Sequence, residues 1–219
     1  MNKEVFDVVI IGAGPSGAVA GAMLSNFGRK VLVVEKEHFP RFSIGESLLP
    51  QCMKFLSDAG LESVVDQLAL DNGFQFKNGA AFTRGDEHSY FDFTQKFSAG
   101  RGTTYQVKRA SFDKLLADGA AEKGVDIRYG QTVTAVDVDS DYPVLEIKTE
   151  DGNEYQAQGK FLLDASGFGR VLPRLLNLEL PSDFPVRQSF FTHFEDNISS
   201  QSFDRDKILI TVHPTKSDI

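Results

Sequence analysis

Two mostly apolar runs, joined by a glycine-rich turn and a helical pattern, open the chain. Residues 5–11 are rich in β-formers and stop at glycines, residues 16–27 are rich in alanine and other small residues, and residues 31–35 form the second run. Strands that are buried on both faces are apolar along their length, and a helix that connects two of them makes them parallel. The pattern therefore predicts a Rossmann-type unit of strand, helix and strand.

Helical and β patterns alternate along the rest of the chain, and there is no internal repeat. We expect helices over 47–59, 61–70, 109–123 and 169–176, short antiparallel strands between 71 and 105, a β meander over 126–158, a buried strand over 161–164, and strands over 187–195 and 207–213. The expected fold class is α/β, with a discontinuous dinucleotide-binding domain over 1–70 and 100–179. Residues 71–99 and 180–219 would form part of an interleaved, antiparallel β-rich substrate domain.

Composition and charge narrow the classes of function. Lys plus Arg total 23 and Asp plus Glu total 31, which gives 23 − 31 = −8 with no long basic run, so nucleic acid is not an expected partner. The first apolar run is too short to span a bilayer and lacks the layout of a signal peptide, so we expect no transmembrane segment and a cytoplasmic location. A single cysteine, Cys52, excludes an intrachain disulfide, and the four histidines lack ligand spacing, so no metal site is expected.

The glycine-rich turn has the spacing of a nucleotide-binding loop. Gly12 lets the chain turn sharply after the first strand, Gly14 lets the backbone approach a pyrophosphate, and Gly17 lets the helix pack closely on the strand. Pro15 and Ser16 begin the helix, whose N-terminal N–H groups and dipole favour phosphate. The turn therefore predicts a dinucleotide site.

An acidic residue ends the second apolar run. Glu35 follows Gly17 by eighteen residues, the position from which a carboxylate accepts hydrogen bonds from an adenosine ribose, and Lys36 comes next. An acid at this position disfavours a cofactor with a 2′-phosphate. The expected cofactor is therefore FAD or NAD.

The segment Phe39-Pro-Arg-Phe-Ser-Ile-Gly-Glu-Ser-Leu-Leu-Pro50 resembles the signature of FAD-dependent halogenases and of the related geranylgeranyl reductases and aromatic hydroxylases. The resemblance implies FAD as the cofactor, with Arg41 near its ribose or pyrophosphate and Gly45, Ser47 and Leu48 beside the isoalloxazine. A guanidinium pairs well with phosphate, and glycine permits close approach of the backbone. A plain loop that enters a helix is the alternative explanation of this segment.

Lys77 is the candidate catalytic residue. The segment Gly73-Phe-Gln-Phe-Lys-Asn-Gly-Ala-Ala-Phe82 is similar to the Lys-x-Gly-Ala segment that carries the essential lysine of the halogenases. The similarity implies that Lys77 holds hypohalous acid or its chloramine beside the substrate. A solvent-facing lysine on a strand is the alternative.

A later segment, residues 105–116, resembles the start of a long helix in the same flavoproteins. The resemblance implies that Gln106 and Arg109 touch the phosphates or the ribityl chain of FAD. An exposed Arg109 in an ordinary first helical turn is the alternative.

Residues 161–167 resemble the strand end that approaches the adenosine half of FAD. The resemblance implies contacts from Asp164, Ala165 and Gly167, because small residues allow close approach and the carboxylate can orient backbone donors. An ordinary strand-to-turn ending is the alternative. Val133 matches a backbone contact to adenine.

Two features of the halogenases are missing from the chain. It has no tryptophan, so a Trp-x-Trp-x-Ile-Pro motif is absent, and it has no Gly-Asp-Ala segment to complete the flavin site. We therefore expect a truncated Rossmann-type FAD-binding fold, the N-terminal part of a longer protein.

The function implied by the resemblance is that of an FAD-dependent oxidoreductase, a monooxygenase-like halogenase. Reduced FAD, O2 and halide would act on a small organic substrate, and a separate flavin reductase would supply the reduced flavin. Two alternatives stay open. One is a flavin dehydrogenase, reductase or hydroxylase of the geranylgeranyl-reductase type, and the other is an FAD-binding fragment without activity of its own.

Overall fold

The largest part of the protein is one mixed sheet. The computed structural model describes residues 3–197, 199 and 204–213. The sheet has six strands in the order β7-β2-β1-β10-β9-β8. Its strands are β1 (Lys3–Ile11), β2 (Val31–Val34), β7 (Asp126–Arg128), β8 (Gln131–Asp137), β9 (Val144–Thr149) and β10 (Glu154–Asp164). Because β2 and β10 both pair with β1 in parallel, the order of the chain reverses at β1.

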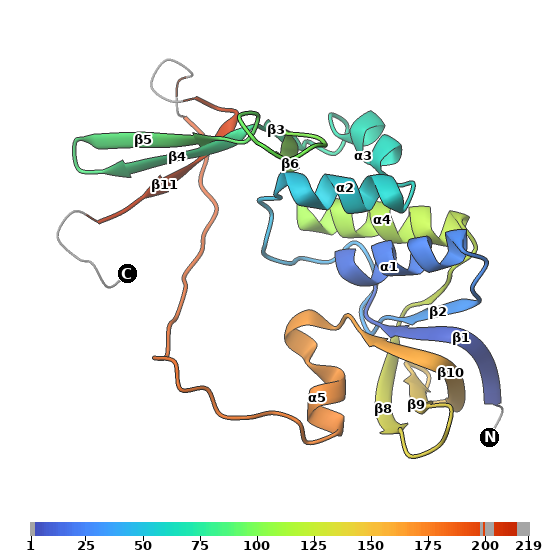
Figure 1. The fold of residues 1–219 in the computed structure, drawn as a ribbon. Coiled ribbons are helices and arrows are strands. Elements are labelled where there is room, and N and C mark those ends of the chain that lie inside the picture. The colour runs from blue at the N-terminus through green and yellow to red at the C-terminus, as the bar shows by residue number, and fades with distance from the viewer. Residues whose placement is uncertain (1–2, 198, 200–203, 214–219) are drawn as a thin grey trace.

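Four helices accompany the parallel part of the sheet (Figure 1). They are α1 (Pro15–Asn26), α2 (Pro50–Asp58), α3 (Glu62–Leu68) and α4 (Arg109–Glu122). The predicted strand, helix and strand at the start of the chain are confirmed as β1, α1 and β2. α1 lies against β1 and β2, α4 packs beside α1, and α2 and α3 pack against these helices.

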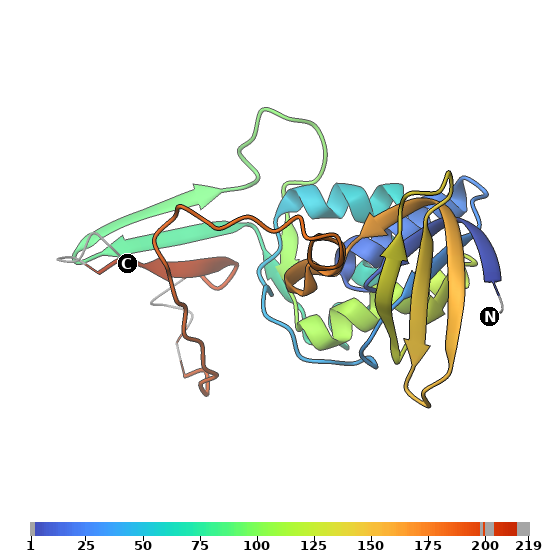
Figure 2. The same ribbon diagram turned by 90° about the horizontal axis from the view of Figure 1, so that it is seen from below.

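The strand β1 is buried on both faces. Val8 and Ile10 face the core beneath the helices, whereas Val9 and Ile11 belong to a second core that includes residues of β8 and β9. Figure 2 shows the strands β8 and β9 standing on the side of β1 away from the helices. Burial on both faces explains why the first strand is apolar at successive positions.

Two small sheets lie beyond the helices. β3 (Gln75–Lys77) pairs antiparallel with β6 (Thr104–Gln106), and β4 (Gly79–Arg84) pairs with β5 (Glu87–Asp92) and with β11 (Lys207–Thr211). The sheet of β4, β5 and β11 projects away from the main body (Figure 1). The predicted division into domains stays a prediction, and residues 198, 200–203 and 214–219 of its last segment lie outside the described residues.

Three expectations about secondary structure are wrong. The helix expected from residue 47 begins at Pro50, because a residue that precedes proline disfavours the helical conformation. The β meander expected over 126–158 and the separate strand expected over 161–164 share one strand, β10, since both halves of β10 pair with β1, and its Phe161 is exposed rather than buried. Residues 187–195 form no strand, as no segment of the described chain pairs with them.

The short helix expected near residue 170 is present as α5 (Val171–Leu175), after a 3-10 turn, η1 (Gly167–Gly169). No helix in the described part of the chain combines the length and the apolar character needed to cross a membrane.

Candidate functional site

A cavity of about 850 Å³ opens at the carboxyl ends of the parallel strands β1 and β2. This is the edge at which the chain order reverses, where open α/β sheets bind their ligands. The volume lies within the range of roughly 300–1,000 Å³ that is typical of ligand sites. Eleven of the predicted site residues line the cavity: Gly12, Gly14, Pro15, Ser16, Glu35, Lys36, Arg41, Arg109, Val133, Ala165 and Gly167.

The three glycines of the loop meet different surroundings. A Cβ on Gly12 would lie 2.7 Å from the carbonyl oxygen of Ala165, and a Cβ on Gly17 would lie 1.9 Å from that of Gly12. At Gly14, by contrast, the nearest atom to such a Cβ is Nη2 of Arg41, at 3.7 Å. Gly12 and Gly17 are therefore required by the fold itself, whereas Gly14 leaves open space next to the cavity.

The N-terminus of α1 faces this open space. Within the described residues no side chain caps the helix, and its N-cap is Gly14 itself. The first-turn N–H groups of an α-helix have no partner inside the helix, and they carry a positive partial charge. The loop and the helix end thus form a cradle that suits a phosphate group.

Glu35 is buried in the wall of the cavity, and its carboxylate binds the glycine loop. Its Oε2 accepts a hydrogen bond from the backbone N–H of Ala13 at 2.8 Å, and its Oε1 accepts one from that of Glu37 at 2.9 Å. Each carboxylate oxygen has a second lone pair, so Glu35 can still accept a hydrogen bond from a ligand hydroxyl. The carboxylate therefore orders the glycine loop, a role that the spacing from Gly17 did not reveal.

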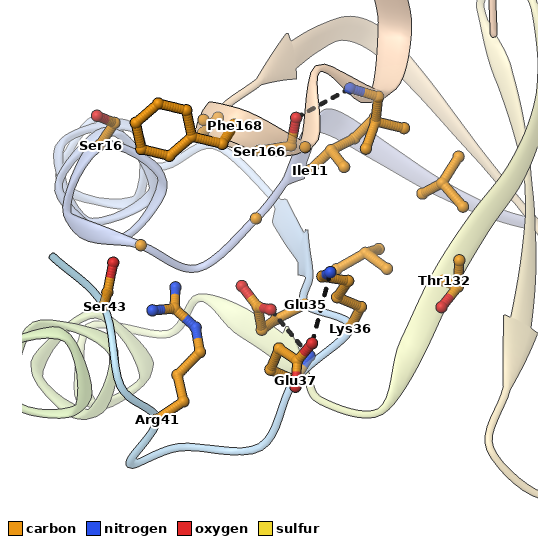
Figure 3. Close-up of a pocket in the computed structure, with 18 of the residues that line it drawn as sticks. Ile11, Ser16, Glu35, Lys36, Glu37, Arg41, Ser43, Thr132, Ser166 and Phe168 are labelled. Carbon is orange, nitrogen blue, oxygen red and sulfur yellow. Dashed lines mark hydrogen bonds and ion pairs between the residues drawn. The ribbon is translucent and has the colours of Figure 1, made fainter. Parts of the chain in front are cut away.

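Two arginines lie on the other side of the cavity. The guanidinium of Arg41 points toward the glycine loop in Figure 3 and lies 4.6 Å from the ring centroid of Phe39. Nη1 of Arg109 donates to the carbonyl oxygen of Ile44 at 2.6 Å, and only 16% of the Arg109 side chain is exposed. The alternative of an exposed Arg109 in an ordinary helical turn is therefore wrong.

Asp164 lies just behind the cavity wall rather than in it. Its carboxylate accepts hydrogen bonds from the backbone N–H groups of Ser166 at 3.0 Å and Leu172 at 2.8 Å. These bonds hold the turn that brings Ala165 and Gly167 to the cavity, so Asp164 orients backbone donors as expected.

Sequence reasoning missed several residues that line the cavity. Phe168 and Ser166 are next to the predicted turn, and Thr132 precedes Val133 on β8, so closeness to a motif was their only signal (Figure 3). Arg174 of α5 had no such signal. The missed lining residues are Ile11, Val34, Glu37, Phe42, Ser43, Ile44, Gln131, Thr132, Ser166, Phe168, Gly169, Val171 and Arg174.

The remaining predicted residues, apart from Gly17 and Asp164, gather around a second centre. Ser47 forms an isolated antiparallel bridge with Gln106 of β6. The ammonium of Lys77 donates to Oγ of Ser47 and to the carbonyl oxygen of Leu48, both at 2.7 Å. Gly45, with a φ of +93°, precedes this contact on the same loop.

Lys77 is a buried cation. Only 1% of the residue is exposed, so the alternative of a solvent-facing lysine is wrong. The ring of Phe93 lies with its centroid 5.2 Å from the ammonium, and no carboxylate within the described residues pairs with it. Burial lowers the pKa of Lys77 from the ordinary value of 10.5, while nearby Cys52 opposes that shift. Perturbed titrating groups of this kind cluster at functional sites.

Across the described residues, no group of three or more His, Cys, Asp or Glu side chains is arranged to hold a metal ion. The thiol of Cys52 donates to the carbonyl oxygen of Leu49 at 2.8 Å.

Comparisons with known proteins agree with the geometry. The family model described as an FAD binding domain matches residues 5–218. A tryptophan 2-halogenase from Chondromyces crocatus is 34% identical over 162 residues, which cover 73% of this chain and 30% of that protein. A 1H-pyrrole-2-carbonyl-[peptidyl-carrier protein] brominase from Pseudoalteromonas luteoviolacea is 36% identical over 169 residues, or 77% of this chain and 39% of that protein.

Among solved structures, a flavoprotein/dehydrogenase from Cytophaga hutchinsonii superposes with a TM-score of 0.77 and 47% identity, covering 82% of this chain and 44% of that one. The chain thus spans less than half the length of each of these three proteins. The cradle at Gly14 and the buried Glu35 fit a dinucleotide, and the family model matches almost the whole chain. The chain therefore belongs to the FAD-binding domain family, with flavin-dependent halogenases among its relatives and FAD as its cofactor.

Proposed function

We propose that this chain is the FAD-binding part of a flavin-dependent halogenase that acts on a small organic substrate. The observation that carries the proposal is the loop of residues 41–48. Arg41, Ser43 and Ile44 of this loop line the cavity, and Ser47 and Leu48 bind the buried Lys77. One short segment thus connects the cofactor site with a buried lysine. The segment around this lysine is similar to the one that carries the essential lysine of the halogenases.

The side chains of the cavity have separate roles in this proposal. The loop from Gly12 to Gly17 and the end of α1 hold the pyrophosphate, Glu35 binds the adenosine ribose, and Arg41 pairs with phosphate. Ala165 and Gly167 lie against the adenosine half, and Val133 offers its backbone to adenine. FAD, when bound and reduced, supplies the electrons with which O2 is activated.

Lys77 acts at the other end of the loop. An ammonium has three donors, and in the described structure Ser47 and Leu48 take two of them. The third donates to an oxidised halogen species and holds it beside the substrate. The ring of Phe93 and the burial of Lys77 exclude water from this position. Gly45, Ser47 and Leu48 would lie beside the isoalloxazine, and Gln106 and Arg109 would touch the phosphates or the ribityl chain of FAD.

The experiment supplies the full-length protein that contains this chain with FAD, a separate flavin reductase with NADH, O2, bromide or chloride, and an aromatic substrate such as tryptophan or a pyrrole. We expect halogen to enter the substrate, which mass spectrometry detects by its isotope pattern. Omitting the reductase should abolish the product. Substrate oxidation that is independent of halide would contradict the proposal.

A flavin dehydrogenase or reductase is the second candidate, because the structure with 47% identity is described as a flavoprotein/dehydrogenase. This function needs no lysine and no halide. Substrate-dependent reduction or oxidation of the flavin under strictly anaerobic, halide-free conditions would favour it. The absence of such turnover would count against it.

Glu35→Gln is expected to weaken FAD binding by about tenfold to a hundredfold, because a charge-assisted hydrogen bond contributes roughly 1.5–3 kcal/mol. The amide cannot accept from the N–H of Ala13 and that of Glu37 with both of its terminal atoms. Glu122→Gln is the matched control, since its exposed carboxylate lies at the end of α4 and does not line the cavity. Fluorescence titration with FAD measures both variants, and equal affinities for the two would refute the role of Glu35.

A further inference from the structure

A buried carboxylate joins the two arginines of the cavity. Asp113 of α4 has no exposed surface. Its Oδ1 accepts from Nε of Arg109 at 2.7 Å, and its Oδ2 accepts from Nη2 of Arg109 at 3.0 Å and from Nη1 of Arg41 at 3.1 Å. Asp113 therefore makes a two-point contact with Arg109 and a single contact with Arg41.

The carboxylate of Asp113 compensates the charges of the two arginines. Two guanidiniums that lie side by side repel each other, and each loses hydration when it is mostly buried. The side chains of Arg41 and Arg109 are 23% and 16% exposed, so both charges depend on Asp113 for compensation. Two guanidiniums and one carboxylate together leave one positive charge at the cavity wall.

The contacts also define which donors face the cavity. Nη1 of Arg109 donates to the carbonyl oxygens of Ile44 at 2.6 Å and Gly45 at 3.5 Å, and these contacts hold the loop of residues 41–48 against α4. Nη2 of Arg41 makes no hydrogen bond within the described residues and is the atom nearest to a Cβ built on Gly14, at 3.7 Å. The side chain that Asp113 anchors through Nη1 thus presents Nη2 to the phosphate cradle.

We propose that Asp113 is the positioning residue of this site: it fixes Arg41 toward the glycine loop and, through Arg109, fixes the loop that leads to Lys77. The proposal rests on the proposed FAD site. Asp113 does not touch the ligand, and it acts through the two arginines.

The direction of the change in FAD affinity distinguishes a positioning role of Asp113 from a purely electrostatic role. Asp113→Asn removes a negative charge near a ligand that carries two phosphates, so a purely electrostatic role predicts tighter FAD binding. The positioning role predicts the opposite, a loss of about tenfold or more, because the amide nitrogen that replaces one carboxylate oxygen cannot accept from a guanidinium. Asp118→Asn is the matched control: it removes a charge from the same helix, where the carboxylate contacts only Lys114 in the described structure, and should change affinity by less than about twofold.

Testing Asp113→Asn in a protein that lacks both arginines distinguishes a positioning role of Asp113 from a merely structural role. In a protein that carries Arg41→Ala and Arg109→Ala, Asp113→Asn is expected to cause no further loss of affinity, since nothing remains to be positioned. The dissociation constant and the number of binding-competent molecules are measured together by calorimetric titration with FAD. If Asp113→Asn fails to fold, Arg109→Lys tests the same contact: it keeps the charge, loses the two-point geometry, and should also weaken binding.

Several results would overturn the inference. These are unchanged or tighter FAD binding by Asp113→Asn or Arg109→Lys, an equal loss in the background without the two arginines, and a fall in competent molecules at constant affinity. Wild-type protein that binds no FAD would instead refute the proposed cofactor site. The two failures are therefore distinguishable.

Discussion

Replacing Gly14 with alanine is expected to remove most FAD binding and to leave the fold intact, whereas the same change at Gly17 is expected to break the fold. The Cβ of an alanine at position 14 would meet no atom closer than 3.7 Å, and the φ of −60° there suits any residue. The free energy of unfolding should therefore change by less than about 0.5 kcal/mol. The added methyl group nevertheless occupies the space into which a pyrophosphate has to come, so affinity should fall roughly tenfold to a hundredfold.

Gly17 provides the contrast. An alanine Cβ there would lie 1.9 Å from the carbonyl oxygen of Gly12, and backbone atoms cannot yield as a flexible side chain can. The strand and helix would have to separate, at an expected cost of at least about 3 kcal/mol. Chemical denaturation measures the stability of both variants, and fluorescence titration measures FAD binding. Wild-type affinity in Gly14→Ala would show that this loop is not the pyrophosphate site.

Lys77→Met is expected to lower halogenation by about a hundredfold or more, because a positioned donor in a dry site contributes this much to a rate. The same change should keep or raise stability, since an apolar side chain of similar size replaces a buried charge without a carboxylate partner among the described residues. Product formation by mass spectrometry and thermal unfolding measure the two effects. If Lys77→Met lost halogenation only because it had lost stability, the proposed role of Lys77 in halogenation would be contradicted.

Lys207→Met is the matched control. Lys207 is also buried, but it donates to Oδ1 of Asn78 at 2.9 Å and to the carboxylate of Asp204 at 2.6 Å. Its removal breaks an ion pair, which Lys77 lacks among the described residues, so this variant should lose stability and retain halogenation in the folded molecules. A gain of stability in Lys77→Met together with a loss of stability in Lys207→Met would support the difference between the environments of the two lysines.

The stability gain of Lys77→Met should depend on pH. Because burial lowers the pKa of Lys77 below 10.5, the unfolded chain holds this proton more tightly than the folded chain does. The cost of the buried charge is present in full below the folded pKa, and it falls as pH rises from there toward 10.5. The difference in the free energy of unfolding between Lys77→Met and wild type is therefore expected to narrow as pH rises from the folded pKa toward 10.5. A difference that grows with pH would contradict the direction of the shift.

The local patterns predicted the start of the fold well. The run of residues 5–11, the glycine turn and Glu35 lie within one strand, helix and strand, so periodicity and turn chemistry suffice to place them. The single strand β10 was missed because both of its halves pair with β1, a contact across about 150 residues that no local pattern shows. Residues 187–195 look like a strand, but an extended apolar segment needs a neighbouring strand.

Parts of the candidate site could not be predicted from the sequence for the same reason, because they depend on contacts between distant segments. The burial of Lys77 results from the approach of Ser47 and Leu48, about thirty residues away. Asp113 was not among the predicted site residues, because a carboxylate in a helix is normally solvent-facing and its two arginine partners become neighbours only in the fold. Resemblance indicated Arg41 and Arg109 separately, and the structure shows that they share one acceptor.

The most direct test of the account is a titration of the chain with FAD in competition with ADP and with FMN. The cavity lies at the glycine loop and Glu35, which we assign to the pyrophosphate and the adenosine ribose. FAD should bind with one-to-one stoichiometry, ADP should displace it, and FMN should not compete at comparable concentration. Binding of FAD that ADP does not displace, or no saturable binding of FAD, would contradict the central claim.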